Sequence, residues 1–287
     1  MTHRPRRSAL FLPASNARAI EKARTLAADV VILDLEDAVA PDRKGEARDA
    51  AVAAVRAGGF GHRELVVRAN AMGAQGADDD LRALKGSGVD AVLLPKVDSA
   101  ATLRHARAVL GDGPALWAMI ETPRAILDLA AIVGAARDTG LAALVAGTND
   151  LAKEIRCRPG VDRAPLIPVL VQIVVAARAA GLVAFDGVSN VLDDEEAVAA
   201  ECRQGLTLGF DGKTLIHPSQ IAPANRVFAP DADAVRWAAA VVASFNHPDA
   251  AAKGAIRVEG QMVERLHLEE ARRTLAIHRA ISDQSRQ

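Results

Sequence analysis

Three carboxylates crowd the end of an apolar run in the stretch VILDLEDAV, where they belong to Asp34, Glu36 and Asp37. Successive side chains of a β-strand alternate between faces, so Asp34 and Glu36 would share one face and Asp37 would lie on the other. Two carboxylates on one buried face repel each other and take up protons unless a cation or hydrogen-bond donors compensate them. Alternatively, the strand has already ended and these residues form a helix N-cap or a solvated turn. Arg68, Lys96 or a divalent metal ion could supply the positive charge.

Glu121 and Asp150 are the strongest candidates for metal ligands. Glu121 ends the apolar stretch LWAMIE, and Asp150 lies in VAGTNDLA, where a glycine allows a sharp turn after a strand. Two carboxylates from neighbouring strand ends, completed by waters and substrate oxygens, are typical of Mg2+ sites. The simpler alternative is that Asn149 or Asp150 is only the N-cap of the helix DLAKEI.

Basic side chains occupy similar positions at other strand ends. Arg68 closes ELVVRAN, where a guanidinium can bind a substrate carboxylate through two hydrogen bonds or pair with the acidic cluster. Lys96 in LLPKV could form a Schiff base, but a structural salt bridge is the simpler interpretation. The stretch GFDGKTLIHPSQ contains His217, and a histidine followed by proline is more often structural than catalytic.

Short β-branched runs alternate with longer segments of helical period, which is typical of repeated βα units around a parallel sheet. The number of such units favours a (β/α)8 TIM barrel, in which chemistry takes place where strands end. Helices are expected at residues 16–27, 43–56, 78–85, 100–110, 124–136, 166–180 and 194–204, and strands at residues 8–12, 30–35, 65–69, 91–97, 116–121, 143–147, 182–188 and, more weakly, 207–213.

The pattern changes after Pro230 to a helix at 232–245, a glycine-punctuated stretch and a final charged helix. We therefore predict a barrel catalytic domain at residues 1–229 and a C-terminal helical extension at 230–287. The extension is too short for a second enzyme domain, so it would be a lid or an arm that completes a neighbouring subunit's site.

Composition excludes several classes of protein. The 35 basic and 36 acidic residues leave a net charge of -1, which argues against nucleic-acid binding. No apolar run reaches the roughly 18 residues that span a bilayer, so no membrane association is expected. Cys157 and Cys202 lack the spacing of a zinc site and are expected to be reduced thiols in a cytoplasmic protein. Motifs for nicotinamide binding, phosphate loops and zinc proteases are absent from the sequence.

Several blocks, taken in order, identify a family. RSALFLPAS, VVILDLEDAV, VVRAN, LLPKV, ETPRAI, AGTNDLAKE, FDGKTLIHPSQ and EGQMVE resemble the citrate lyase β-subunit-like CoA-ester lyases of the HpcH/HpaI aldolase superfamily, which includes malyl-CoA and citramalyl-CoA lyases. The resemblance covers residues 7 to about 275. Within this family, the LWAM-ET block, GTNDLAKE and the ending VERLH look most like the (3S)-malyl-CoA thioesterases.

The resemblance implies a barrel that binds Mg2+ and a CoA thioester, assembled as a homo-oligomer, a trimer or a hexamer. It assigns Glu121 and Asp150 as metal ligands and Arg68 as the arginine that holds the keto acid. It also assigns Glu36 and Asp37 as acidic residues near the metal, and Gly147, Thr148 and Asn149 as the loop that lines the metal. The positions near CoA are Lys22, Ile216, His217 and Pro218.

One position departs from the family pattern. The block EGQMVERLH places Glu264 where the lyases have an aspartate that acts as acid or base in a neighbouring subunit's site. One extra methylene moves a carboxylate by about an ångström, and such misplacement can cost on the order of a hundredfold in rate. The leading prediction is Mg2+-dependent carbon–carbon cleavage of a malyl-, citramalyl- or citryl-CoA type ester, with Glu264 or an aspartate of the acidic cluster as the acid. Hydrolysis of the same thioester and a non-catalytic CoA-ester-binding subunit are the alternatives.

Overall fold

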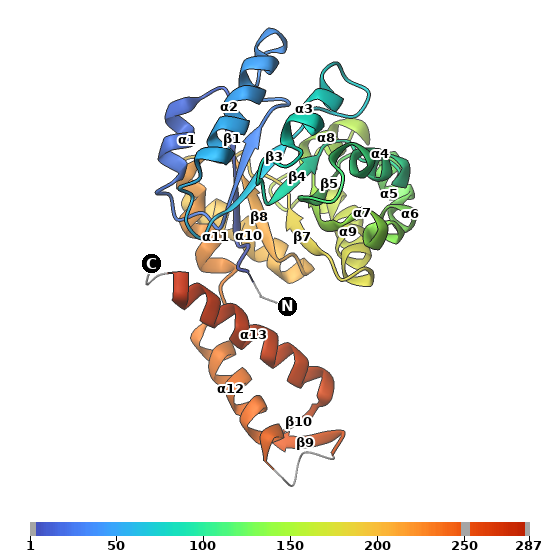
Figure 1. The fold of residues 1–287 in the computed structure, drawn as a ribbon. Helices are drawn as coiled ribbons and strands as arrows, with labels where there is room; N and C mark the ends of the chain where they lie inside the picture. Colours follow the sequence, from blue (N-terminus) through green and yellow to red (C-terminus); the bar gives the residue numbers. More distant parts are fainter. Residues whose placement is uncertain (1–3, 248–252, 285–287) are drawn as a thin grey trace. The chain divides into compact units, whose positions relative to one another are not determined.

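Eight parallel strands form a closed barrel in the computed structural model, which describes residues 4–247 and 253–284 (Figure 1). Each strand pairs with the next along the chain, and β8 pairs with β1 to close the barrel. This arrangement confirms the predicted (β/α)8 fold. The strands are β1 (Ser8–Pro13), β2 (Val30–Asp34), β3 (Glu64–Arg68), β4 (Ala91–Leu94), β5 (Ala115–Ile120), β6 (Leu141–Ala146), β7 (Val183–Asp186) and β8 (Gly212–Leu215).

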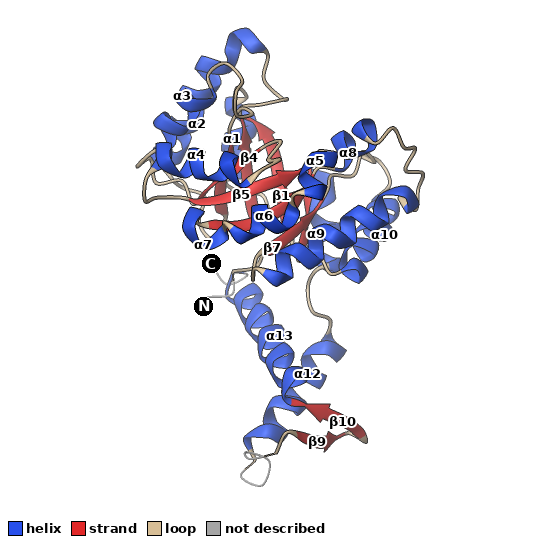
Figure 2. Ribbon diagram, turned by 90° about the vertical axis from the view of Figure 1, so that its right-hand side faces the viewer, coloured by secondary structure: helices blue, strands red, loops and turns tan. Residues whose placement is uncertain are grey.

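Helices follow the strands and cover the outside of the barrel (Figure 2). They are α1 (Ala17–Ala23), α2 (Lys44–Ala57), α3 (Ala77–Leu84), α4 (Ala100–Leu110), α5 (Pro123–Leu127), α6 (Leu129–Gly134), α7 (Ala136–Thr139), α8 (Thr148–Glu154), α9 (Ile167–Ala179), α10 (Glu195–Leu208) and α11 (Ile221–Val227), with short 3-10 turns at Pro41–Arg43, Ala164–Leu166 and Pro218–Gln220.

Several predicted elements differ from the observed ones, and two of the differences have a clear local cause. The strand predicted at 207–213 begins only at Gly212, because α10 continues through Leu208 and ends at Gly209, whose φ of 99° suits glycine. The single helix predicted at 124–136 is divided into α5, α6 and part of α7, since Asp128 and Ala135 leave helical geometry. Both differences lie at chain turns that hydrophobic periodicity does not reveal.

The barrel interior is filled by side chains from alternating strand positions. Trp117 and Phe185 are fully buried and stack with ring centroids 4.8 Å apart. Val30, Leu93 and Val145 belong to the same buried cluster. Bulky apolar packing of this kind makes the barrel a solid core, so ligands must bind at its rim.

The chain divides into two compact units. Residues 6–226 form the barrel unit, and the described residues from 227 onward, with residues 4 and 5, form the second. The second unit contains α12 (Ala232–Asn246), a hairpin of β9 (Ala255–Val258) and β10 (Gln261–Glu264), and α13 (Arg265–Gln284). Glu259 and Gly260 both have positive φ and form the two-residue turn between the strands.

The C-terminal unit has a hydrophobic cluster of its own, in which Val241 and Phe245 of α12 pack with Val263 and Leu268. Sequence patterning predicted its two helices but not the hairpin between them.

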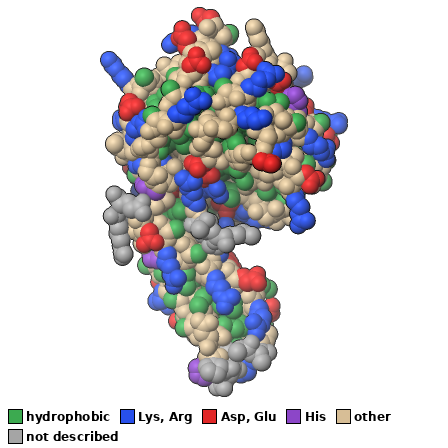
Figure 3. Space-filling view, in the orientation of Figure 1, with side chains coloured by type: hydrophobic (Ala, Val, Ile, Leu, Met, Phe, Trp, Pro, Cys, Tyr) green, Lys and Arg blue, Asp and Glu red, His purple; other side chains and the backbone are tan. Residues whose placement is uncertain are grey.

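In the space-filling view, basic and acidic side chains are interspersed over the visible face of the barrel (Figure 3). Within the described residues, no helix is both long and apolar enough to cross a membrane.

Candidate active site at the carboxyl ends of the strands

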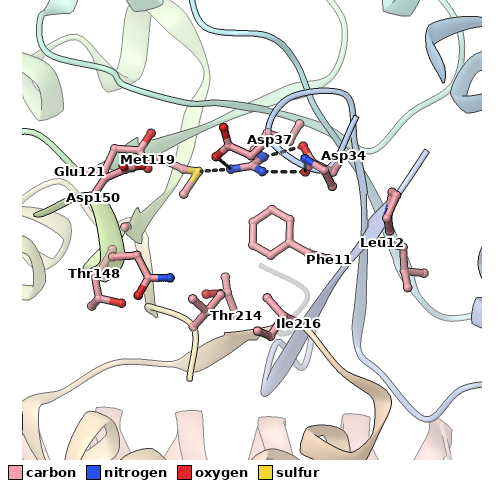
Figure 4. Close-up of a pocket in the computed structure, with 17 residues that line it drawn as sticks. Phe11, Leu12, Asp34, Asp37, Met119, Glu121, Thr148, Asp150, Thr214 and Ile216 are labelled. Carbon is pink, nitrogen blue, oxygen red and sulfur yellow. Dashed lines mark hydrogen bonds and ion pairs between the residues drawn. The ribbon is translucent and has the colours of Figure 1, made fainter. Parts of the chain in front are cut away.

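A cavity of about 380 Å³ opens at the carboxyl ends of the barrel strands (Figure 4). Its walls come from β1, β2, β3, β5, β6 and β8 and from the loops that follow them, and all its lining residues belong to the barrel unit. The charged lining residues are Asp34, Asp37, Arg68, Glu121 and Asp150. The position is the usual one for TIM-barrel active sites.

Arg68 is buried at the end of β3 and is held by Asp34 at the end of β2. Its Nε donates to Asp34 Oδ1 at 2.7 Å and its Nη2 to Oδ2 at 2.6 Å, so the pair is bidentate. Burial alone would lower the pKa of Arg68, but hydrogen bonding to Asp34 and the nearby charges of Glu36 and Asp37 raise it above its usual range. The guanidinium therefore stays positively charged inside the cavity.

Asp34 also organises the chain that follows it. Its two carboxylate oxygens accept hydrogen bonds from the main-chain N–H groups of Glu36 and Ala38 at 2.9 and 3.1 Å. Asp34 therefore ends the strand and begins the turn while it binds Arg68. Lys44 reinforces this turn, because its Nζ donates to the carbonyl oxygens of Leu35 and Glu36 at 3.2 and 3.1 Å.

Glu36 lies between two cations, which explains how the acidic cluster is tolerated. Its Oε1 accepts from Lys96 Nζ at 2.8 Å, and its Oε2 lies 3.0 Å from Arg68 Nη1 without a well-aligned hydrogen bond. Burial raises the pKa of Glu36, and the charges of Arg68 and Lys96 partly oppose that rise. Lys96 thus forms a salt bridge with Glu36, in agreement with the simpler of the two interpretations of its sequence. Asp37 is more exposed, with its Oδ2 3.6 Å from Arg68 Nη1.

Glu121 and Asp150 lie beside each other across the cavity from Asp34 (Figure 4). Glu121 follows β5, is 1% exposed and accepts the main-chain N–H of Lys96 through Oε1 at 2.7 Å. Burial, together with the negative charges of Glu36 and Asp150, raises the pKa of Glu121 to about 7. Asp150 lies in the first turn of α8, whose N-cap is Gly147. The alternative that Asn149 or Asp150 is merely the N-cap is therefore wrong.

The Glu121 and Asp150 pair fits a divalent cation. A buried carboxylate whose charge is opposed by two neighbouring carboxylates would be stabilised by a bound positive ion. Within the described parts of the chain, no group of three or more His, Cys, Asp or Glu residues could hold a metal. Two carboxylates with open positions for water and substrate oxygens match Mg2+, which is usually bound through one or two carboxylates.

Gly147 makes room for Glu121. A Cβ atom at position 147 would lie 2.3 Å from Glu121 Cβ and 2.5 Å from its Oε2, closer than atoms can approach. Thr148 and Asn149 continue the cavity wall, and the side-chain amides of Asn149 and Asn190 hydrogen-bond to each other, with one contact at 2.9 Å. The absence of a side chain at Gly147 therefore leaves the space that the Glu121 carboxylate occupies.

The residues predicted near CoA are distributed unevenly. Ile216 lines the cavity. His217 is exposed and accepts the N–H of Ser219, and Pro218 begins the following 3-10 turn. Lys22 is exposed on α1 and does not line the cavity. Glu264 ends β10 in the C-terminal unit, where it is exposed and its N–H donates to His267 Nδ1. Their roles in CoA binding and catalysis stay predictions.

The structure adds cavity residues that the sequence did not single out as site residues. These include Phe11, Met119 and Thr214. The guanidinium carbon of Arg68 lies 4.9 Å from the Phe11 ring centroid, and Arg68 Nη1 lies 3.7 Å from Met119 Sδ. Apolar residues near strand ends look like core residues in a sequence, so only the strand register could have distinguished them.

The chain is similar in sequence to known proteins over nearly its whole length. The chain is 45% identical over 278 residues to the (3S)-malyl-CoA thioesterase of Cereibacter sphaeroides (strain KD131), covering 97% of this chain and 96% of that protein. It is 32% identical to citrate lyase subunit beta of Leuconostoc mesenteroides subsp. cremoris, covering 96% of this chain and 94% of that protein.

A solved structure shares both the fold and much of the sequence. Protein CitE of Mycobacterium tuberculosis, in complex with magnesium, acetoacetate and coenzyme A, matches with a TM-score of 0.77 at 31% identity, covering 97% of this chain and 99% of that one. The HpcH/HpaI aldolase/citrate lyase family matches residues 7–218. Because that match spans most of the chain, and because the resemblance of its sequence blocks points the same way, this protein belongs to the HpcH/HpaI aldolase/citrate lyase family.

Proposed function

We propose that this protein is a Mg2+-dependent enzyme that hydrolyses a malyl-CoA-type thioester to malate and CoA. The observation that carries the proposal is the cavity in which a buried arginine faces a pair of carboxylates suited to a metal. The full-length similarity to a (3S)-malyl-CoA thioesterase and the glutamate at position 264 favour hydrolysis over the carbon–carbon cleavage that the sequence blocks first indicated.

The acid portion of the substrate would bind in the cavity. Its volume of about 380 Å³ suits a four-carbon acid rather than a whole CoA ester, so the CoA portion would extend outside it. Arg68 is charged, buried and held rigidly by Asp34, and would bind the terminal carboxylate of the substrate. Phe11 and Met119 beside Arg68 would exclude water from that contact.

Glu121 and Asp150 would hold Mg2+, which supplies Lewis-acid polarisation of substrate oxygens when bound. The magnesium in the solved CitE complex supports this cofactor assignment. Lys96 and Arg68 offset the charge of Glu36, which would hold the guanidinium in place rather than exchange protons. Thr148 and Asn149 would line the metal position.

Hydrolysis needs a base that removes a proton from water as the water oxygen attacks the acyl carbon. The carbon–sulfur bond then breaks, and the CoA thiolate takes up a proton. Asp37 is the cavity carboxylate most open to solvent and is the candidate within the barrel unit. Glu264 is the candidate from the C-terminal unit, and its role would be to orient the water.

Carbon–carbon cleavage is the second candidate. The similarity to a citrate lyase subunit and the acetoacetate in the CitE complex favour it. In that reaction a base takes the substrate hydroxyl proton, the bond between the hydroxyl carbon and the acyl-CoA carbon breaks, and the acyl-CoA enolate is protonated. The same arginine and the same metal ligands would serve both reactions.

The assembly of the protein as a trimer or hexamer stays a prediction.

Product analysis tests the proposal. The purified protein is incubated with Mg2+ and (3S)-malyl-CoA, and malate, free CoA, glyoxylate and acetyl-CoA are measured together. Malate and CoA without glyoxylate support hydrolysis, whereas glyoxylate with acetyl-CoA establishes cleavage instead. Arg68→Gln should abolish either activity, and Arg124→Gln, which removes an exposed ion pair with Asp128, is the matched control. No turnover of the substrate by the unmodified protein would refute both reactions.

A further inference from the structure

Lys96 has an unusual backbone conformation immediately after β4. Its φ is 51°, in the left-handed region, which residues other than glycine, asparagine and aspartate seldom adopt. Val97 returns to the regular pattern, since its N–H donates to the carbonyl oxygen of Met119 at 3.3 Å. Such strain persists where surrounding structure determines it, and it concentrates at functional sites.

Lys96 makes two separate contacts with buried carboxylates. Its main-chain N–H donates to Glu121 Oε1 at 2.7 Å, whereas its side-chain Nζ donates to Glu36 Oε1 at 2.8 Å. The side chain is 42% exposed, so its ion pair is screened by solvent. The main-chain contact instead reaches a carboxylate that is 1% exposed.

The main-chain contact fixes how Glu121 presents its oxygens. With Oε1 held by Lys96, Oε2 lies on the side of Gly147, where the absence of a Cβ leaves space. Asp150 lies in the first turn of α8, whose N-cap is Gly147, and lines the same cavity. A hydrogen bond to one oxygen of a carboxylate ligand commonly sets the direction of the other.

We propose that Lys96 is a positioning residue whose main chain, through its left-handed conformation, orients Glu121 for the divalent cation, while its side chain serves only Glu36. This inference rests on the metal site of the proposed function. It separates two roles of one residue and predicts that metal binding depends on the backbone conformation at position 96 and not on the lysine side chain.

Paired substitutions test the inference through metal binding alone. Lys96→Gly and Lys96→Val both remove the ammonium group, but only glycine adopts a positive φ readily, and a β-branched valine resists it. Mn2+ is the probe, and the free ion is measured by electron paramagnetic resonance. Lys96→Gly should keep the Mn2+ affinity within about threefold of the unmodified protein, and Lys96→Val should weaken it by about tenfold or more.

Further variants separate positioning from general strain. Lys96→Asn should bind Mn2+ like Lys96→Gly because asparagine tolerates the left-handed region, and Lys96→Ala should bind less well. This second pair decides the question if Lys96→Val does not fold. Glu259 has a φ of 45° in the hairpin of the C-terminal unit, so Glu259→Gly and Glu259→Val control for strain elsewhere and should leave Mn2+ affinity unchanged.

Equal affinities for the glycine and valine variants, or for the asparagine and alanine variants, would overturn the inference. If all four Lys96 variants bind Mn2+ equally weakly, the lysine side chain and not the backbone conformation positions Glu121. If the unmodified protein itself binds no Mn2+, the metal site of the proposed function is wrong, and the role of Lys96 falls with it.

Discussion

Arg68 meets carboxylates that come from one short segment of chain. Asp34 binds it through two hydrogen bonds, and Glu36 and Asp37 lie within 3.0 and 3.6 Å of Nη1. Arg68 therefore contacts all three carboxylates of the cluster, and the bidentate pair with Asp34 fixes the orientation of its guanidinium. A lysine at position 68 could keep the charge but would lose the bidentate geometry.

The close contact between Gly147 and Glu121 can be tested by adding a methyl group at position 147. Gly147→Ala would place a methyl group 2.3 Å from Glu121 Cβ, so Glu121 or the start of α8 must move. We expect Mn2+ affinity to fall by about tenfold or more. We also expect the free energy of unfolding to fall by about 1–3 kcal/mol, as for other overpacked sites. Calorimetric titration with Mn2+ and urea denaturation measure the two effects.

Gly134→Ala is the matched control for that substitution. Gly134 lies at the end of α6, and apart from its own helix backbone and chain neighbours no atom lies within 4 Å of its Cβ position. Its unfolding free energy should change by no more than about 0.5 kcal/mol, and its metal affinity should not change. If the Gly147→Ala protein binds Mn2+ as tightly as the unmodified protein, the start of α8 can shift to accept the methyl group, and Gly147 is not needed to position Glu121.

Sequence reasoning found the charged residues of the cavity but not all their partners. Glu121, Asp150 and Arg68 stand out because polar residues interrupt apolar strands, and a barrel collects strand ends at one rim. Choosing among three neighbouring carboxylates requires coordinates, so Asp34 was not assigned as the partner of Arg68. The main-chain role of Lys96 is also invisible in sequence, because residue type does not report a backbone angle.

The two loops that follow β7 and β8 are joined by one buried side chain, that of Gln220. Its Nε2 donates to the carbonyl oxygens of Ser189 and Val191 at 3.0 and 2.8 Å. Its Oε1 accepts the N–H groups of Ile216 and His217 at 2.9 and 3.2 Å. Gln220 is fully buried, and all four contacts are with main-chain groups. It therefore fixes the rim near Val188 and Ile216, two cavity-lining residues.

Replacing Gln220 by methionine tests this connection between elements. Gln220→Met keeps the side-chain volume but leaves several buried main-chain groups without partners, at about 1–3 kcal/mol for each unsatisfied group. We expect the free energy of unfolding in urea to fall by at least about 2 kcal/mol. Gln172→Met on the exposed face of α9 is the control and should change stability little. A loss below about 0.5 kcal/mol at position 220 would mean that water replaces the amide.

Element boundaries were predicted best where strands are long and apolar. The β2, β3 and β5 segments were placed within a residue of their observed ends because their buried runs are continuous. The last strand was placed too early because Thr207 and Leu208 are equally acceptable in a helix. The hairpin of β9 and β10 was missed because its short strands are mostly exposed and show no continuous apolar run.

The C-terminal unit carries the residue that distinguishes this chain from the lyase pattern. Glu264→Asp shortens that carboxylate by one methylene and restores the residue type expected for cleavage. We expect the product ratio from (3S)-malyl-CoA to shift by about tenfold or more toward glyoxylate and acetyl-CoA, because small displacements of catalytic groups have large effects. Chromatographic quantification of all four products measures the shift.

Glu269→Asp in α13 is the control, since it shortens an exposed carboxylate of the same unit. Its product ratio should equal that of the unmodified protein. If Glu264→Asp also leaves the ratio unchanged, Glu264 does not decide between hydrolysis and cleavage, and the difference must lie among barrel residues.

Each of the two units contains one of the protein's two tryptophans. Trp117 is enclosed in the barrel against Phe185, whereas Trp237 is partly buried against the small cluster of the C-terminal unit. Intrinsic fluorescence can therefore follow the two units independently. With Trp237 replaced by phenylalanine, emission reports only the barrel, and with Trp117 replaced it reports only the C-terminal unit. Two coincident denaturation curves would mean that the units unfold as one, and separate midpoints would give each its own stability.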